Sequence, residues 1–255
     1  MNPLIKANAV NMLKQYQIKR HSEFDLYEIM NAEGLLIQRV YLENSIGSIS
    51  YDSRGGIVSI DANITDEKQS RFIAAHEFGH FVNEREKSGY FRCNGEMIFG
   101  TNTNLTLESN ASRFGVELIM FEDWFLKFIK GKRFGVQLIK DISDYFGVSL
   151  SSSALRYAEL GYTPMAVILS QNGKVVWNSI NKSFCYSWIP KGYKVNNLSY
   201  AYDFFEGKEI PDFPETILAD AWFLEDRTYR KDHFLLEHNI PMPRYDAVLS
   251  IVWEG

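Results

Sequence analysis

The chain has 255 residues, 45% of them hydrophobic and 15% aromatic, with a formal net charge of −5 at pH 7. A chain of this length and apolar content can bury a substantial core, and we expect two modules rather than one. The mild negative charge gives no general attraction to nucleic acid, and no segment is apolar for long enough to span a bilayer.

The first quarter of the chain predicts two helices followed by the strands of a small sheet. Amphipathic spacing indicates helices at residues 4–18 and 24–30, and strand-like runs follow at 35–42 and 47–51. The clearest strand is residues 57–64, where apolar and polar side chains alternate, as in a strand that is buried on one face.

A helix with a recognisable start follows this strand. Thr65 or Asp66 can cap its N-terminus, and Asp66 and Glu67 place negative charge in its first turn, where the helix dipole favours it. Residues 88–104 are rich in Gly and Asn and are predicted to form a loop. Beyond this loop we predict helices at residues 105–120, 122–130, 136–146 and 151–160.

The pattern changes near residue 161, where strand signals replace helical ones. Two apolar runs, 165–169 and 174–178, flank Asn172-Gly173, a pair that favours a two-residue hairpin turn. Further strands are predicted at residues 217–223 and 247–253, and a helix at 200–205. The sequence therefore predicts an α+β fold, with a mixed first region and a β-rich second region.

His76, Glu77 and His80 form an HExxH motif within the long helix. Two histidines four residues apart lie on one face of a helix, so both imidazoles can bind a single Zn²⁺ at about 2.0–2.1 Å. The intervening glutamate then lies beside a water molecule at the metal. The alternative is a pair of ordinary helix-surface histidines, which the flanking sequence makes the weaker interpretation.

A catalytic zinc site usually has three protein ligands and an open position, so a third donor is required. Glu108 is our candidate, because it follows His80 by 28 residues and stands at the start of a predicted helix whose small residues would allow close approach. Glu117 is the competitor, but nine residues are two and a half helical turns, so it points the opposite way. His233 and His238 lie in the other region and are interpreted as ordinary surface or core residues.

Two segments that contain these residues resemble the ImmA/IrrE family of zinc metallo-endopeptidases. The first, KQSRFIAAHEFGHFV, matches the family pattern RFxxAHExGH, and the second, LESNASRFGVELIM, matches ExxAxxFAxELLMP. A later family pattern, a phenylalanine, then Val-Ser, then a helix that contains arginine, is present as Phe146, Val148, Ser149 and Arg156. The resemblance covers residues 50–160.

The chain departs from the family patterns at three positions. Ser112 stands where Asn or Asp is usual, Gly115 where Ala is usual and Phe121 where Pro is usual. We interpret the first two as changes in helix packing rather than in metal ligation. Without proline, the helix is expected to continue or bend near Phe121 rather than stop.

The resemblance implies a zincin-like metallopeptidase domain at residues 1–130, a helix-turn-helix-like segment at 131–160 and a β-rich, GAF-like sensory domain at 161–255. The implied activity is zinc-dependent cleavage of a protein partner, a helix-turn-helix transcriptional repressor. Its destruction would switch on stress-response, mobile-element or phage-defence genes. The alternative function is non-catalytic: a metal-containing protein that sequesters a repressor or senses a ligand.

The residues themselves indicate metal-assisted hydrolysis of an amide bond. His76, His80 and Glu108 would bind one Zn²⁺ per chain, which lowers the pKa of its water from about 15.7 towards about 7. Glu77 would take the proton from that water and later hand it to the leaving amine. Residues 57–64 either form an edge strand that pairs with an extended substrate or lie in the interior of the sheet.

Cys93 lies in the predicted loop between His80 and Glu108. A thiolate binds Zn²⁺ well, at about 2.3 Å, so a loop that folds over the site would let Cys93 occupy the water position and silence the enzyme. The alternative is a thiol with no role, since a free cysteine is often just a small hydrophobic residue. The one other cysteine is Cys185, so no disulfide framework is predicted and a cytoplasmic protein is the simplest expectation.

Residues 141–160 have the spacing of a helix-turn-helix, which raises the question of DNA binding. Several basic residues lie nearby: Lys127, Lys130, Lys132, Arg133 and Lys140. The second helix, however, contains only Arg156 as a cation, so packing helices are favoured and direct nucleic-acid binding is not expected.

Overall fold

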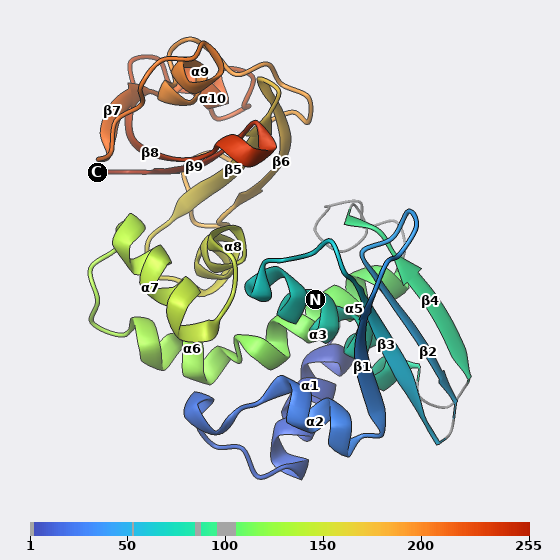
Figure 1. The fold of residues 1–255 in the computed structure, drawn as a ribbon. Coiled ribbons are helices and arrows are strands. Elements are labelled where there is room, and N and C mark those ends of the chain that lie inside the picture. Colours follow the sequence, from blue (N-terminus) through green and yellow to red (C-terminus); the bar gives the residue numbers. More distant parts are fainter. Residues whose placement is uncertain (1–2, 53, 85–87, 96–105) are drawn as a thin grey trace. The chain divides into compact units, whose positions relative to one another are not determined.

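The computed structural model describes residues 3–52, 54–84, 88–95 and 106–255. Contacts between residues divide the chain into two compact units. The N-terminal unit consists of Met1–Lys130 and Ile142–Ser149, and the C-terminal unit consists of Gly131–Asp141 and Leu150–Gly255. Each unit combines helices with a sheet (Figure 1), so the predicted α+β fold class is confirmed. The boundaries predicted for the functional domains stay predictions.

The N-terminal unit combines a four-stranded sheet with helices. Its helices are α1 Pro3–Gln15, η1 His21–Glu23, α2 Leu26–Ala32, α3 Glu67–Asn83, α5 Thr106–Ile119 and α6 Glu122–Ile129. Its strands are β1 Leu35–Val40, β2 Gly47–Asp52, β3 Gly55–Asp61 and β4 Gly89–Cys93. The helices and strands predicted within residues 4–64 are present, with ends that differ by a few residues.

The strand order of this sheet is β1-β3-β2-β4, with β1 parallel to β3 and the other neighbours antiparallel. Of the two placements considered for residues 57–64, the interior one is therefore right, because β3 is paired on both sides. β4 lies at the edge and, among the described strands, pairs with β2 alone (Figure 1). It replaces the start of the loop predicted at 88–104, whose remainder from residue 96 lies outside the described residues.

α3 carries the HExxH motif and contacts α5 as well as β2 and β3. Of the two predicted caps, Thr65 and Asp66, it is Asp66 that caps α3, by accepting a hydrogen bond from the Gln69 N–H. From residue 70 through 81 every side chain except that of Arg71 is buried. The two helices approach closely because small residues face each other: a Cβ on Gly79 would lie 2.6 Å from the Ala111 carbonyl oxygen.

α6 follows α5 after a short break. At Phe121 the backbone turns out of the helical region, with ψ 133°, so the helix is interrupted there even without a proline. α7 Val136–Phe146 and α8 Leu150–Leu160 come next. The Arg156 side chain on α8 is buried and pairs with Glu159, so it is not presented to a phosphate backbone, which agrees with the preference for packing helices.

The C-terminal unit is built on a five-stranded antiparallel sheet of order β6-β5-β9-β8-β7. Its strands are β5 Met165–Gln171, β6 Lys174–Ile180, β7 Glu215–Leu218, β8 Phe234–Met242 and β9 Ala247–Trp253. Its short helices are α9 Tyr200–Phe205, α10 Asp220–Phe223 and η2 Pro243–Tyr245. Asn172 and Gly173 both have positive φ, 50° and 70°, which is the hairpin turn that the sequence predicts.

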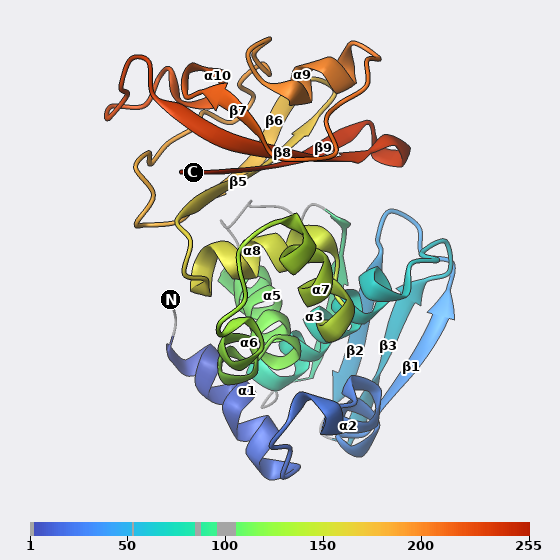
Figure 2. The ribbon, with the colours of Figure 1, turned by 90° about the vertical axis from the view of Figure 1, so that its left-hand side faces the viewer.

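Helices cover both faces of this second sheet. α9 and α10 lie over one face and α8 over the other (Figure 2), and every residue of the central strand β9 is buried. The strand predicted at 217–223 is only partly right, because β7 ends at Leu218 and the next residues form α10, whose Trp222 and Phe223 enter the core. A short apolar run fits a buried strand or a buried helix equally well, so its pattern cannot separate the two.

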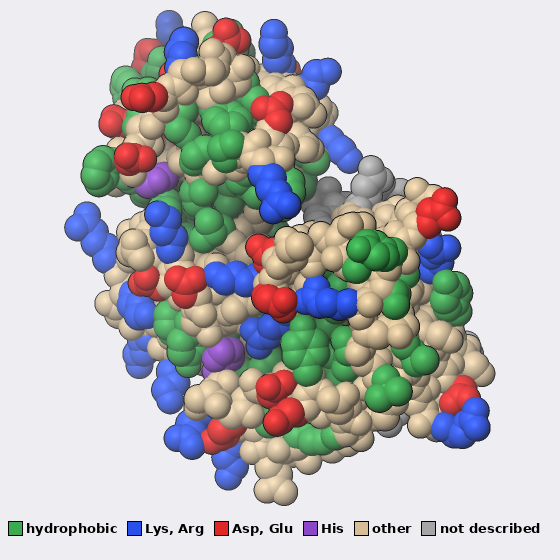
Figure 3. All heavy atoms as spheres, in the orientation of Figure 1, with side chains coloured by type: hydrophobic (Ala, Val, Ile, Leu, Met, Phe, Trp, Pro, Cys, Tyr) green, Lys and Arg blue, Asp and Glu red, His purple; other side chains and the backbone are tan. Residues whose placement is uncertain are grey.

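Charged side chains of both signs occupy the face of the protein that Figure 3 shows. On the face shown in Figure 3, Lys and Arg are interspersed with Asp and Glu. Such a face does not have the basic patch that is typical of nucleic-acid binding. Within the described ranges, the protein has no helix that combines the length and the apolar character needed to cross a membrane.

Candidate metal centre

Four side chains from three elements of the N-terminal unit converge on one point. His76 and His80 come from α3, Cys93 from β4 and Glu108 from the first turn of α5, and their ligand atoms all lie within 4.8 Å of one another. His76 Nε2 lies 3.1 Å from both His80 Nε2 and Glu108 Oε2, and Glu108 Oε2 lies 3.4 Å from His80 Nε2. The structure thus brings together the three residues that the sequence predicts as zinc ligands.

The spacing of these three atoms suits a single metal ion. Ligand atoms that lie 2.0–2.1 Å from the centre of a tetrahedron are about 3.3–3.4 Å from one another. The observed separations are 3.1–3.4 Å. Two imidazole nitrogens and a carboxylate oxygen are also the donor types that Zn²⁺ prefers, so both the distances and the chemistry of the donors fit this ion.

Two neighbours fix the orientation of the imidazoles. Ser112 Oγ on α5 lies 2.9 Å from His76 Nδ1, so the Nδ1–H can donate to this hydroxyl and leave the Nε2 lone pair for a metal. Phe91 on β4 stacks on the His80 ring, with ring centroids 4.1 Å apart and an interplanar angle of 13°. Both residues therefore act on the metal centre through the histidine that each contacts.

Sequence reasoning missed both of these residues. Ser112, interpreted from the sequence as a packing residue rather than a ligand, also forms a hydrogen bond with His76. A usable signal was its position four residues after Glu108, which places both residues on one face of α5. Phe91 was hidden within the segment predicted as a loop, where nothing local indicated a strand.

Burial and charge set the protonation states of the ligands. Burial lowers the pKa of His76, which keeps this imidazole neutral at neutral pH, as metal ligation requires. Burial raises the pKa of Glu108, but hydrogen bonds and charge from the two histidines outweigh this effect. They hold the pKa of this carboxyl far below its usual value. The centre therefore presents a carboxylate together with a neutral imidazole.

Glu77 is fully buried on α3, against β2. A Cβ on Gly47 would lie 2.5 Å from Glu77 Oε1, so a residue with a side chain at position 47 would displace the carboxylate. Neither oxygen has a hydrogen-bond partner of good geometry among the described residues. Burial raises the pKa of Glu77 to about 8, with the nearby Cys93 thiol opposing this rise and the charge of Glu108 adding to it. A carboxyl that titrates near neutral pH suits proton transfer.

Cys93 is buried at the same point. Its Sγ lies 3.5 Å from His80 Nε2 and 3.6 Å from Glu108 Oε2. Burial raises the pKa of this thiol, and the carboxylates of Glu77 and Glu108 raise it further, so the thiol keeps its proton when no metal is bound. The cysteine predicted as a fourth donor therefore lies beside the three predicted ligands.

Glu117, the competing third ligand, does not lie at this centre. Its buried carboxylate pairs with Arg113, one turn earlier on α5. Of the two carboxylates on α5, Glu108 is therefore the one that lies beside the histidines, as the count of helical turns predicts.

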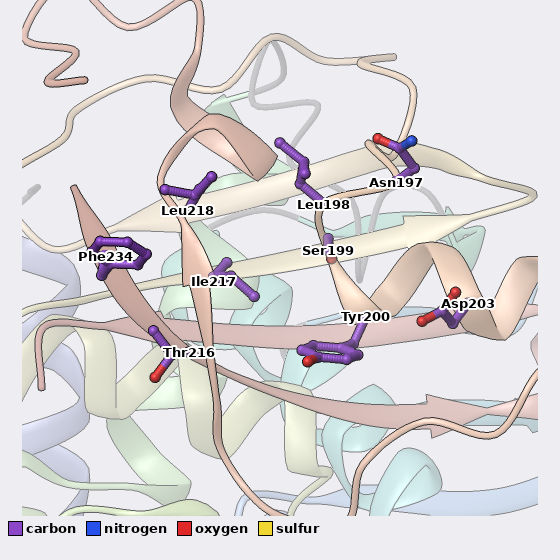
Figure 4. A pocket seen from close by; sticks show the side chains of 9 residues that line it. All are labelled: Asn197, Leu198, Ser199, Tyr200, Asp203, Thr216, Ile217, Leu218 and Phe234. Carbon is purple, nitrogen blue, oxygen red and sulfur yellow. The ribbon is translucent and has the colours of Figure 1, made fainter. Parts of the chain in front are cut away.

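The C-terminal unit contains a pocket of a different character, beside α9 and β7 (Figure 4). It is lined by Asn197, Leu198, Ser199, Tyr200, Asp203, Thr216, Ile217, Leu218 and Phe234. Asp203 pairs with Lys208, so its charge is already compensated. This pocket contains neither of the two clusters of potential metal ligands that occur among the described residues.

Comparisons with known proteins point to one family. Residues 31–157 match the family described as the IrrE N-terminal-like domain, a family of peptidases. No curated protein matches the chain. A solved structure described as a Mycobacterium tuberculosis transcriptional regulator is similar, with a TM-score of 0.58 and 13% sequence identity over 99% of this chain and 88% of that chain. At this level of identity the similarity concerns the fold alone.

Proposed function

We propose, from the premise that residues 31–157 of this chain belong to the ImmA/IrrE family of metallopeptidases, that it is a zinc-dependent endopeptidase that cleaves a protein partner. The observation that carries this proposal is the convergence of His76, His80 and Glu108 on one point, with Glu77 buried beside the first of them. Ligand atoms at tetrahedral spacing and a base next to them are the parts that metal-assisted hydrolysis requires.

Each residue has a definite task in this proposal. His76 and His80 would hold the ion through Nε2, and Glu108 would hold it through Oε2, because these are the atoms that converge. When bound, Zn²⁺ supplies Lewis-acid chemistry, which polarises a carbonyl group and makes water more acidic. Glu77 accepts a proton from the attacking water and passes it to the nitrogen of the leaving amine. Its two carboxylate oxygens are available for this transfer, because no described residue makes a well-formed hydrogen bond to them.

An extended peptide would bind along β4 in this proposal. Among the described strands, β4 has one edge without a neighbour, and it ends at Cys93 beside His80. A peptide that adds to this edge would gain main-chain hydrogen bonds and bring its backbone near the metal centre. The substrate-pairing role considered for residues 57–64 therefore moves to β4.

The protein partner that we propose is a helix-turn-helix transcriptional repressor. The family resemblance implies this class of substrate. Cleavage of such a repressor would release the genes that it holds silent.

Substitution of Glu108 by Ala should remove the cleavage, and in a Cys93→Ser background it should also remove the metal, because two histidines alone leave the site one ligand short. Bacterial cells that express the native chain or Glu108→Ala can be compared by mass spectrometry of protein N-termini. We expect a new N-terminus within a helix-turn-helix repressor with the native chain only. Zinc in the purified Cys93→Ser protein should fall by about one ion per chain when Glu108→Ala is added. Ser109→Ala, at the exposed neighbouring position of α5, is the matched control. New N-termini that appear equally with Glu108→Ala would contradict the proposal.

A further inference from the structure

We propose that Cys93 is a fourth protein ligand of the metal centre and closes it in the resting protein. This inference rests on the proposed function, because it assumes that His76, His80 and Glu108 hold a metal ion. The four side chains then form a complete set of two imidazoles, a carboxylate and a thiolate. A set of four protein donors is typical of a closed zinc site, whereas an open catalytic site has three.

The distances from Sγ have the lengths that shared coordination requires. A zinc-bound sulfur lies about 2.3 Å from the metal and a nitrogen or oxygen ligand about 2.0–2.1 Å, so a tetrahedral edge that joins them is about 3.5–3.6 Å long. Cys93 Sγ lies 3.5 Å from His80 Nε2 and 3.6 Å from Glu108 Oε2. The edges between nitrogen and oxygen atoms are shorter, 3.1–3.4 Å.

The pairing of β4 with β2 places Cys93 at the metal centre. In the pairing of β2 with β4, Cys93 lies opposite Gly47, and the Cys93 carbonyl oxygen accepts a hydrogen bond from the Ile46 N–H at 2.9 Å. Phe91, two residues earlier and thus on the same face of β4, stacks on the His80 ring. One strand therefore brings both a ring and a sulfur atom to the same histidine.

The consequence for chemistry follows from the number of donors. On coordination the S–H bond of Cys93 is replaced by a bond from sulfur to the metal, and the thiol proton passes to solvent. No position is then left for water or for a substrate carbonyl, so cleavage requires that Cys93 leave the metal. β4 is an edge strand and pairs with β2 alone among the described strands, so fewer hydrogen bonds hold it than hold β2 or β3. A protein substrate that adds to the free edge of β4 is the kind of partner that would displace Sγ.

Cobalt substitution tests the ligation directly. The chain has two cysteines, so in a Cys185→Ser background Cys93 is the one source of a thiolate signal. The full chain is stripped of metal and titrated with Co²⁺, and the thiolate-to-cobalt absorption in the near ultraviolet is recorded. We expect this absorption to appear with the first equivalent of Co²⁺. Addition of Cys93→Ser should remove the absorption while one equivalent still binds in a manner that depends on Glu108.

Cleavage is the second readout. In cells with ample zinc, Cys93→Ser should raise the yield of the new repressor N-terminus at least about tenfold over the native chain, because the serine variant leaves a position open. A tenfold change corresponds to ~1.4 kcal/mol of preference for the closed state. The two readouts test separate parts of the proposal, the ligation and the silencing.

The outcomes are distinguishable. Cobalt that binds through Glu108 without a thiolate absorption would overturn the ligation by Cys93 and leave the proposed function intact. Cobalt binding that is unchanged by the substitution Glu108→Ala would count against the proposed metal centre itself. A thiolate absorption with unchanged cleavage in Cys93→Ser would overturn the closing role.

We propose a second metal site in the C-terminal unit on a separate observation. Cys185, His233 and Glu254 offer ligand atoms within 4.8 Å of one another, and His233 Nε2 lies 3.7 Å from Glu254 Oε1. A thiolate, an imidazole and a carboxylate together suit Zn²⁺ or Co²⁺. None of the three is fully buried, so an ion can reach them from solvent. Burial and the nearby carboxylate of Glu254 raise the pKa of the Cys185 thiol to about 11, and the charge of Arg230 opposes this rise.

Neighbouring hydrogen bonds hold two of these donors in place. Tyr186 Oη lies 2.7 Å from His233 Nδ1, which orients the ring so that Nε2 is the atom left for a metal. The segment after Cys185 is held by Asp226, whose carboxylate accepts hydrogen bonds from two successive backbone N–H groups at 2.8 and 2.7 Å. Hydrogen bonds from neighbouring residues thus support the cluster, as a ligand set requires.

The same titration isolates this site when it is done in a Cys93→Ser background. We expect a thiolate-to-cobalt absorption that saturates with one equivalent beyond the equivalent bound through Glu108. His233→Ala should abolish it, and so should Glu254→Gln, which changes an exposed side chain and does not endanger folding. Binding of one equivalent in total, with no thiolate absorption, would overturn the second site.

Discussion

Substitution of Glu77 by Gln is expected to lower the rate of peptide-bond cleavage by about 10²–10⁴-fold while the chain keeps its metal ion. Gln has nearly the shape of Glu, but its amide cannot take a proton from water. The buried position tolerates the change, since no hydrogen bond of good geometry within the described residues depends on the carboxylate. His76, His80 and Glu108 are untouched, so the metal should stay.

Cleavage and zinc content should be measured on the same preparations, in the native chain and in a Cys93→Ser background, so that a closed centre does not hide the effect. Glu67→Gln is the matched control, because Glu67 lies on the same helix, is exposed and pairs with Arg39 at 2.8 Å. Full cleavage by Glu77→Gln would remove Glu77 from the role of base. Binding of a repressor without cleavage, by both the native and the Cys93→Ser chains, would favour the non-catalytic alternative.

The helix that carries His76, Glu77 and His80 could be predicted because its signals are local. An N-cap, an acidic first turn and two histidines at a spacing of four can all be recognised within a short window. Glu108 required more: the start of a second helix, small residues along it and the family resemblance. Its oxygen lies within 3.4 Å of both histidine nitrogens, so these signals pointed to a residue that the fold does place beside the motif.

The remainder of the centre depends on pairing between distant segments. β4 could not be predicted, because its ladder with β2 joins Cys93 to Gly47, 46 residues earlier, and no alternation marks so short a strand. The contact of Phe91 with His80 could not be predicted either, because Phe91 lies on β4. Residues 57–64 alone could not show that β3 is an interior strand. Its two neighbours, β1 and β2, are determined by the strand order of the whole sheet.

Gly79→Ala should lower the affinity for zinc by about 10–100-fold and destabilise the fold by about 1–3 kcal/mol. An added Cβ would lie 2.6 Å from the Ala111 carbonyl oxygen and 2.8 Å from its Cα, and backbone atoms cannot rotate away as a side chain can. α5 must therefore move, and Glu108 and Ser112 move with it. The gain in helix propensity, about 1 kcal/mol, offsets only part of the loss. Competition with a fluorescent chelator and urea unfolding of the metal-free chain measure the two effects.

Gly115→Ala is the matched control, because it adds the same methyl group at the same pair of helices. Its Cβ would lie 3.3 Å from the nearest atoms of Ala75, a distance that a shift of a few tenths of an ångström relieves. The family resemblance also places alanine at this position. We expect zinc affinity to stay unchanged and stability to change by less than about 1 kcal/mol, as the gain in helix propensity offsets the tighter contact. If both substitutions left zinc affinity unchanged, the distance between α3 and α5 would not be what sets the metal centre, and the positions of Glu108 and Ser112 would need another cause.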